Sequence, residues 1–359
     1  MTHERPADKH ADHGPLGGAA VPHPDAAPSP SPSPDASDAS EGRYRERPSG
    51  ATAWERWSPT RRMAYRLRKL AAHPRPLRLI ASRALWACGV SERFVSTMPR
   101  GFRMRFYPSS VSAALWADPR ARSTDEDFVC AVLRPGDRYI DAGANVGQLA
   151  LAAATRVGAA GEVVAVEAHP RIYRYLEGNV ALNPALRVVT IHRALGDHDG
   201  AVTFSDRHAD DQNHITEGRG VDVPMSPLDA LVPPAPTRLL KLDVEGFELP
   251  VLQGAAQTLS ATELVYCELS EGNCARFGYA PVEVETLLLD AGFVFVRPRG
   301  DGTPVVTERP YFASLGSGAR PATGFNLIAA KPRTAPDAVE ALSRLAGASR
   351  AEAAQKRSS

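Results

Sequence analysis

The stretch YIDAGANVGQLAL, residues 139–151, decides the fold of this chain. Its first two residues are typical of the end of a buried strand, and Asp141 follows at the carboxyl end of that strand. Gly143 and Gly147 frame a turn, because glycine tolerates positive φ and lets the backbone approach a ligand closely. An alanine-rich helix is predicted to begin at the second of these glycines. Ligands of open α/β sheets bind beyond the carboxyl ends of the strands, so this loop predicts a nucleotide-like cofactor.

The spacing within the loop distinguishes between two kinds of cofactor. A dinucleotide fingerprint has three glycines in the order G-x-G-x-x-G, so that pyrophosphate rests on the N-terminus of the helix. Here Ala142 and Ala144 interrupt that order, and an acid, Asp141, precedes the first glycine. A carboxylate is unfavourable for pyrophosphate but suits an ammonium group, which S-adenosylmethionine carries. The alternative is a tight turn between a strand and a helix that binds no ligand.

The segments after the loop alternate between strand and helix patterns. Residues 161–170 (GEVVAVEAHP) are predicted to form a second buried strand that ends in Glu167. An acid at this place hydrogen-bonds ribose hydroxyls in nucleotide-binding α/β folds, although a solvated acid before a turn is the alternative. A helix is expected over 171–183, a third strand and its loop over 187–197, and further strands within 237–248, 263–270, 292–298 and 325–332, in line with helical and extended periodicity. Shorter strands are expected within 201–206 and from residue 221. This alternation favours βαβ units and a parallel sheet.

Five motifs together resemble those of the FkbM-type methyltransferases. They are DAGANVG from Asp141, VEAHP from Val166, ALGDHDG from Ala194, KLDVEGFE from Lys241 and VLQGA from Val251. The resemblance covers about residues 101–332, and the KLDVEGFE run is its most specific element. Two departures are visible: Ala168-His169 stands where Pro-Asn is usual, and the long N-terminal segment is extra.

The resemblance implies a fold, an activity and a cofactor. Members of the family are S-adenosylmethionine-dependent O-methyltransferases that often act on sugar or polyketide hydroxyls. The expected fold is the class I methyltransferase (Rossmann-like) α/β fold. It has a seven-stranded, mostly parallel sheet with helices on both faces and an antiparallel last strand.

The residues that bind the cofactor are expected at the loop and at the ends of the next two strands. Asp141 is assigned to the region near the amino group of the methionyl part. Four residues are expected to approach that part through their backbone: Gly143, Ala144, Asn145 and Gly147. Glu167 is assigned to the ribose hydroxyls. Asp197 is assigned to the adenine amino group, although a turn-forming role in LGDHDG explains this aspartate equally well.

Methyl transfer from a sulfonium requires an aligned acceptor hydroxyl and removal of its proton. Asp243, at the carboxyl end of the fourth strand, is the first candidate for the base, provided that burial or a neighbour raises its pKa. His214, in a His- and Asp-rich loop, is the second candidate, since histidine titrates near neutral pH. A histidine in such a loop is also explained as a solvated side chain.

Further charged residues flank Asp243. Glu245 and Glu248 are expected on one face of the next helix, where stabilisation by the helix dipole is a competing explanation. Lys241 is expected to pair with one of these carboxylates, and Glu268 to complete the cluster. Asp243, Glu245 and Glu268 offer the oxygen ligands that Mg²⁺ prefers, but their spacing does not require a metal, so none is predicted.

Composition divides the chain into four parts. Residues 1–50 are rich in Pro, Ala, Ser, Asp and His and are predicted to be a disordered tail. Residues 51–100 are predicted to be a basic helical extension, 101–333 the methyltransferase domain, and 334–359 a C-terminal helix and tail.

Charge and cysteine usage bear on partners and location. The net charge of +1 gives no argument for a nucleic-acid partner. The basic stretch of residues 43–83 contains interleaved aromatic residues, and such a stretch can bind an anionic membrane surface or nucleic acid. A membrane is the expected partner of the two. The alternative is a solvated helical segment that packs on the catalytic domain. There is no signal peptide pattern and no run of about eighteen apolar residues. The four cysteines lack metal-ligand spacing, so a cytoplasmic protein with reduced thiols is expected.

The leading hypothesis is an S-adenosylmethionine-dependent O-methyltransferase with a small-molecule or glycan acceptor: a hydroxyl of a sugar, glycolipid or polyketide-type secondary metabolite. Residues 101–132 form an entry segment, in which GFRMRFYP indicates a strand and EDFVCAVL a helix. Contacts to the acceptor are expected from this entry segment and from the irregular segments 205–225 and 300–323. An NAD-dependent oxidoreductase is disfavoured by the interrupted glycine spacing. A catalytically silent cofactor-binding or membrane-surface adaptor is disfavoured by the acid cluster around Asp243.

Overall fold

The computed structural model describes residues 58, 60–61, 63–64, 68, 73–206, 214–216, 219–298, 303–314 and 325–358. All of these residues belong to the unit Tyr44–Ser359. The tail predicted over residues 1–50 lies outside the described residues, as do large parts of the segments 51–72, 205–225 and 300–323.

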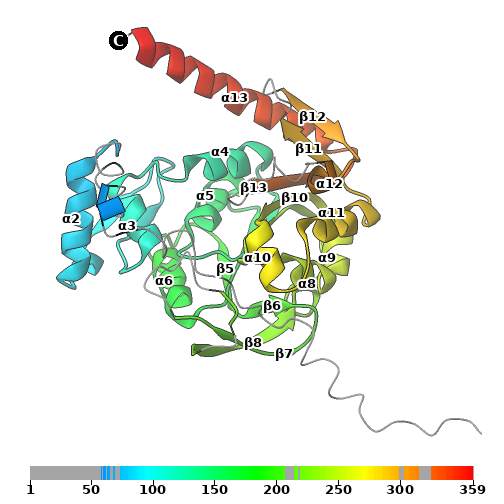
Figure 1. Ribbon diagram of the computed structural model, residues 1–359, viewed down its shortest axis with the longest axis horizontal. Coiled ribbons are helices and arrows are strands. Elements are labelled where there is room, and N and C mark those ends of the chain that lie inside the picture. Colours follow the sequence, from blue (N-terminus) through cyan, green and yellow to red (C-terminus); the bar gives the residue numbers. More distant parts are fainter. Residues whose placement is uncertain are drawn as a thin grey trace, which may run out of the picture. The chain divides into compact units, whose positions relative to one another are not determined.

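A mixed sheet of eight strands forms the centre of this unit (Figure 1), in the order β12-β11-β13-β10-β9-β3-β4-β5. In chain order, the strands are β3 (Arg138–Ala142), β4 (Glu162–Glu167), β5 (Val188–His192), β9 (Thr237–Leu242), β10 (Thr262–Leu269), β11 (Val294–Pro298), β12 (Pro304–Thr307) and β13 (Phe325–Ala330). The strands from β5 to β10 pair in parallel, and β13 is antiparallel to both of its neighbours. The class I methyltransferase sheet with its antiparallel last strand is confirmed.

The number of strands is a correction, because seven were expected. Strand β12 pairs antiparallel with β11 and adds an eighth strand at the edge. Its first residue is Pro304, which an edge strand tolerates because no ladder hydrogen bond is lost there. The surrounding glycines and prolines gave this segment the appearance of a loop.

Alternating side chains of the central strands bury two apolar layers, one on each face of the sheet. One layer contains Tyr139, Leu239 and the other strand residues that point to the same face of the sheet. It is covered by α4 (Ser123–Val132), α5 (Gln148–Val157) and the start of α13 (Ala335–Ser358). The other layer contains Ile140, Leu240 and their equivalents, and is covered by α8 (Glu248–Gln253), α9 (Ala256–Ser260) and α11 (Pro281–Asp290). Helix α6 (Pro170–Ala181) lies beside β4 and β5. The remaining short helices are α10 (Glu271–Arg276) and α12 (Tyr311–Ser314).

A second, three-stranded sheet in the order β6-β8-β7 follows the third strand of the main sheet. It consists of β6 (Ala194–Gly196), β7 (Gly200–Phe204) and β8 (Val221–Pro227), and the helical turn α7 (Leu228–Leu231) follows β8. The short strands expected within 201–206 and near 221 are present. Within 187–197, the expected strand is β5, but part of the expected loop, residues 194–196, forms the strand β6, which leaves the main sheet and pairs in parallel with β8.

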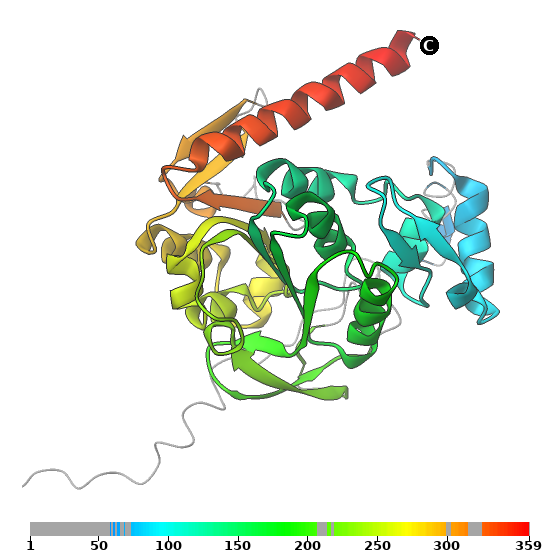
Figure 2. The same cartoon turned by 180° about the vertical axis from the view of Figure 1, so that it is seen from behind.

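Ahead of the sheet, the chain forms helix α2 (Pro76–Ala87), the single turn η1 (Ser91–Arg93), the hairpin of β1 (Val95–Thr97) and β2 (Arg103–Arg105), and helix α3 (Ser110–Ala117). Strand β2 and helix α4 lie where the sequence indicates a strand and a helix. Figure 2 shows α2 and α3 (blue and cyan) far from β11 and β12 (orange), which form one edge of the main sheet. No helix among the described residues is long and apolar enough to cross a bilayer, and the expected cytoplasmic location stays a prediction.

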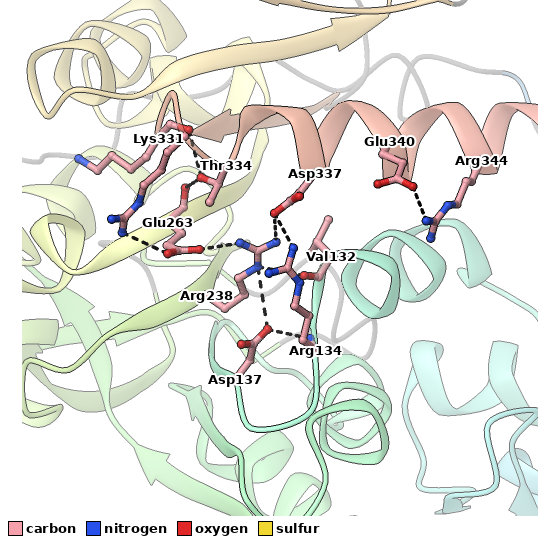
Figure 3. Close-up of polar contacts among 11 residues, drawn as sticks. Val132, Arg134, Asp137, Arg238, Glu263, Lys331, Thr334, Asp337, Glu340 and Arg344 are labelled. Atoms are coloured by element: carbon pink, nitrogen blue, oxygen red, sulfur yellow. Dashed lines mark hydrogen bonds and ion pairs between the residues drawn. The ribbon is translucent and has the colours of Figure 1, made fainter.

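An ion cluster fixes α13 to the amino end of the sheet (Figure 3). Arg238, near the start of β9, donates to Glu263 (2.6 Å) and to Asp337 of α13 (2.6 Å), and its Nε donates to the carbonyl of Val132. Burial alone would lower the pKa of Arg238, but the two ion pairs raise it. The guanidinium group therefore stays charged and joins the sheet, α4 and α13.

Candidate active site

A cavity of about 260 Å³ opens beyond the carboxyl ends of β3, β4 and β9. Nine of the residues singled out from the sequence line it: Asp141, Gly143, Ala144, Asn145, Glu167, Lys241, Asp243, Glu245 and Glu268. The fold thus gathers residues from four separate strand ends at one site, as expected for ligands of open α/β sheets.

The glycine loop has a backbone that other residues would not permit. Gly143 has φ of 79°, and a Cβ added to it would lie 1.9 Å from the backbone oxygen of Asp243. Gly147 has φ of 88° and precedes α5, while its added Cβ would meet Leu176 at 2.6 Å. Gly147 does not line the cavity, so it shapes the turn. Asn145 is also left-handed (φ 49°), a conformation that asparagine tolerates well.

Glu167 ties the end of β4 to this loop. Its carboxylate accepts hydrogen bonds from the backbone N–H of Asn145 (2.9 Å) and of His169 (2.8 Å). Burial raises the pKa of Glu167 to about 7, although both N–H groups act in the opposite direction. Each oxygen keeps acceptor capacity toward the cavity, which suits the ribose hydroxyls.

Asp141 and Lys241 form a buried ion pair below the loop. Asp141 is fully buried, and its Oδ1 lies 3.2 Å from Lys241 Nζ. Its Oδ2 has no hydrogen-bond partner in the described part of the chain. Burial raises the pKa of Asp141, and the charge of Lys241 opposes that rise. A buried carboxylate with a spare acceptor fits an additional ammonium group.

Lys241, which lies in β9, links the glycine loop after β3 to the carboxyl end of β9. Its Nζ donates to the carbonyl of Gly143 (2.8 Å) and lies 3.5 Å from Asp243 Oδ2. Burial would lower the pKa of Lys241, but Asp141 and Asp243 raise it overall. The ammonium group therefore stays protonated, and the ion pair expected from the sequence is present.

Asp243 follows β9 and faces the cavity beside two charged side chains. Arg122, which the sequence analysis missed, places Nη2 3.9 Å from Asp243 Oδ2. Glu268 lies near the end of β10, and its pKa is raised by the charge of Asp243 and by burial. Arg122 is left-handed (φ 63°) and precedes α4, and no local pattern signals that it reaches a residue so distant in the chain. Two carboxylates and a guanidinium group thus surround this end of the cavity.

Glu245 and Glu248 do not share a helix face, which corrects the expectation from their spacing. Glu245 lies in a left-handed turn (φ 55°) before α8 and accepts a hydrogen bond from Asn273 (3.1 Å). Glu248 is buried away from the cavity and accepts hydrogen bonds from the backbone N–H of Gly246 (3.0 Å) and the hydroxyl of Tyr279 (3.2 Å). Burial raises the pKa of Glu248 to about 7. Glu248 thus holds the turn below Asp243 and does not face the acceptor.

Two further expected residues are not brought to the cavity. Asp197 follows β6, and its carboxylate lies 2.6 Å from the Nδ1 of His198, which agrees with the turn-forming alternative. His214 is buried, and its backbone exchanges hydrogen bonds with Ser205. Its imidazole does not line the cavity, because this segment pairs with the small sheet. Among the described residues, no group of three or more His, Cys, Asp or Glu is arranged to hold a metal ion.

The small sheet supplies an apolar wall that the sequence indicated only in part. Its cavity-lining residues are Leu195, Phe204 and Ile215. Ile215 belongs to the segment 205–225, which was expected to contact the acceptor. His169 also lines the cavity, and its Nδ1 accepts a hydrogen bond from the N–H of Arg171 (3.2 Å) at the start of α6. Histidine thus fulfils at this position the capping role that asparagine commonly has.

Part of the chain is similar to known methyltransferases. Residues 141–295 match the methyltransferase FkbM domain, whereas no curated protein matches the chain. Similar solved structures include an S-adenosylmethionine-dependent O-methyltransferase from Thermotoga maritima, at 16% identity and a TM-score of 0.35 over 58% of this chain and 64% of that one. Another is a putative rRNA methylase from Clostridium thermocellum, at 11% identity and a TM-score of 0.36 over 58% of this chain and 94% of that one. Fibrillarin from Aeropyrum pernix, with natively bound S-adenosylmethionine, matches at 14% identity and a TM-score of 0.32 over 58% and 74%. Residues 141–295 are therefore similar to the methyltransferase FkbM domain, and the protein is an S-adenosylmethionine-dependent methyltransferase.

Proposed function

We propose that this protein transfers a methyl group from S-adenosylmethionine to a hydroxyl of a sugar, a glycolipid or a polyketide-type metabolite. One observation carries the proposal: the carboxylates of Asp243 and Glu268 share one cavity with the glycine loop of residues 141–147. One cavity is therefore lined both by residues suited to bind the methyl donor and by carboxylates suited to deprotonate an acceptor.

The donor half of the cavity fits the functional groups of S-adenosylmethionine. Asp141 offers a buried, partly unpartnered carboxylate for the α-ammonium group. Glu167 offers two oxygens for the ribose hydroxyls. When bound, S-adenosylmethionine supplies an electrophilic methyl group.

The acceptor half contains the groups that take the hydroxyl proton. As the acceptor oxygen forms its bond to the methyl carbon, the bond from that carbon to sulfur breaks, and the proton passes to the carboxylate pair of Asp243 and Glu268. The raised pKa of Glu268 makes this pair a better proton acceptor than an isolated surface carboxylate. A well-placed base contributes about 10²–10⁴-fold to such a reaction. Lys241, held protonated, is a positioning residue that fixes Asp243 relative to the loop.

The test measures donor binding and turnover separately. We expect calorimetry to detect S-adenosylmethionine but not NAD, and a methyl-donor assay against a panel of glycans and polyketides to identify an acceptor. With that acceptor, Asp243→Ala is expected to abolish turnover and to leave donor affinity within about tenfold, because a base acts on the chemical step. The control is Asp199→Ala, an exposed aspartate outside the cavity, which should retain full activity. Full turnover in Asp243→Ala would refute the mechanism, and preferential binding of NAD would refute the function.

A further inference from the structure

Helix α2 (Pro76–Ala87) is apolar on the face that it exposes to solvent. Leu77 is 80% exposed and Ile80 is 50% exposed, and Ala84 and Ala87 are also exposed. Residues three and four apart lie on one side of a helix, so these side chains form a continuous stripe. The opposite side of α2, which includes the buried Ser82, packs against α3.

Exposed apolar side chains concentrate in this part of the described chain. Seven large apolar residues are exposed: Met63, Leu77, Ile80, Phe94, Val95, Val189 and Val306. Five of the seven fall between positions 63 and 95. Single exposed apolar residues are ordinary, whereas a concentration of them indicates an interaction surface.

The same segment has an extreme charge balance. Residues 61–105 contain twelve Lys and Arg residues and a single acid, Glu92, although the whole chain is nearly neutral with 42 basic and 41 acidic residues. Arg75, Arg83 and Arg93 are exposed. Exposed positive charge therefore lies on α2 and close to its two ends in the chain, as in helices that lie on the surface of a membrane.

The basic, apolar segment is connected to the acceptor end of the cavity. Helix α3, which packs on α2, contributes Val111 to the cavity lining, and Arg122 follows α3 in the chain and faces Asp243. A partner bound at α2 would thus lie one helix away from the catalytic carboxylates. Figure 1 shows α2 at the outer side of α3.

We propose that α2 and the segment that follows it, residues 73–105, dock on an anionic phospholipid surface, with Leu77 and Ile80 inserted among the acyl chains and the exposed Arg75, Arg83 and Arg93 bound to lipid phosphates. Charge complementarity selects an anionic partner. The aliphatic stripe selects a bilayer over nucleic acid, because phosphate and base edges offer no apolar volume for leucine and isoleucine. This docking does not depend on the proposed methyl transfer.

The test is sedimentation of the full-length protein with phospholipid vesicles. We expect binding to vesicles of phosphatidylcholine with phosphatidylserine, little binding to phosphatidylcholine alone, and weaker binding at high salt. The double variant Leu77→Glu with Ile80→Glu should lower the partition coefficient by more than about tenfold, because it places charges in the acyl-chain region. The matched control is Val306→Glu, a residue 48% exposed on β12, which should bind as the unmodified protein does.

A second pair of variants tests the charges. Arg83→Glu with Arg93→Glu should also lower binding by more than about tenfold, because each basic residue near an anionic surface contributes about fivefold. The control, Arg219→Glu with Arg309→Glu, reverses exposed arginines outside residues 61–105 and should have little effect. Calorimetry with S-adenosylmethionine checks that each variant is folded, and it separates loss of docking from loss of methyl-donor binding.

Several results would overturn the proposal. Equal binding to neutral and anionic vesicles, or unchanged binding of Leu77→Glu with Ile80→Glu, would exclude this surface as the docking site. Tighter binding of RNA than of vesicles would assign the basic segment to nucleic acid instead. Ultracentrifugation that shows a dimer dissociated by the same double variant would assign the stripe to a second copy of the chain.

Discussion

Replacing Lys241 with methionine removes the ammonium group that lies between two carboxylates at the centre of the site. At 3.2 Å from Asp141 and an effective dielectric constant of about 20, Coulomb's law gives an attraction of about 5 kcal/mol. Desolvation of the lysine offsets part of this attraction, but the substitution also leaves Asp141 buried without its cation. Breaking buried pairs in this way typically costs about 3–5 kcal/mol, and we expect Lys241→Met to lower the free energy of unfolding by that amount at pH 8.

The loss should depend on pH with a defined sign. Burial already raises the pKa of Asp141 above its ordinary value, and removal of Lys241 raises it further. A carboxyl group with a higher pKa in the folded state than in the unfolded state destabilises the fold as pH rises from about 4 through the folded-state pKa. The difference between the two proteins should therefore be smaller at pH 5 than at pH 8.

Urea denaturation followed by tryptophan fluorescence at both pH values measures this effect. The control is Lys331→Met, whose ammonium group donates to the carbonyl of Ala291 and lies over the ring of Phe293 at 4.1 Å. Because this substitution leaves no buried carboxylate without its cation, it should cost only about 1–2 kcal/mol. Adding Asp141→Asn to Lys241→Met should recover much of the lost stability, because it removes the unpaired charge. A loss below about 1 kcal/mol, equal losses at both pH values, or the absence of rescue would refute this account of the buried pair.

Three further predictions concern the loop, the ribose position and the opposite end of the sheet. Gly143→Ala should abolish donor binding in calorimetry because its Cβ would overlap a backbone oxygen at 1.9 Å, whereas Gly158→Ala, with φ of 68°, ψ of −168° and open space, should cost about 1–3 kcal/mol of stability and retain binding. Donor affinity should fall as pH drops from 8 to 6, because the carboxylate of Glu167, with a pKa of about 7, accepts ribose hydroxyls when ionised; Glu167→Gln should bind more weakly and without this pH dependence. Arg238→Met should lower the free energy of unfolding by about 2–4 kcal/mol without changing donor affinity, whereas loss of the exposed ion pair in Arg344→Met should cost less than about 0.5 kcal/mol.

The sequence predicts the loop and the strand ends that surround the cavity, because local signals dictate them. Positive φ at Gly143, the strand ends at Asp141 and Glu167, and the motif around Asp243 are all properties of short segments. Alternation of buried residues likewise predicts the central strands, since every second side chain points to the same face.

The remaining errors arise where backbone conformation or distant contacts override local patterns. The spacing of Glu245 and Glu248 suggests one helix, but Gly246 (φ 102°) joins a left-handed turn to a later helix start. Arg122 reaches Asp243 only because α4 packs against the sheet, and the spacing of apolar residues along the sequence does not indicate this packing. Strand β6 switches sheets because β8 supplies its partner, and that pairing is non-local.

The contact between Gly143 and the backbone of Asp243 also limits how such an enzyme can diversify. No β-carbon fits between the donor loop and the end of β9. Position 143 therefore accepts no residue larger than glycine while this contact is kept. Phe204 and Ile215, by contrast, line the cavity from the small sheet. New acceptor specificities are therefore most accessible through the small sheet, where a substitution reshapes the cavity and leaves the methyl-donor geometry intact.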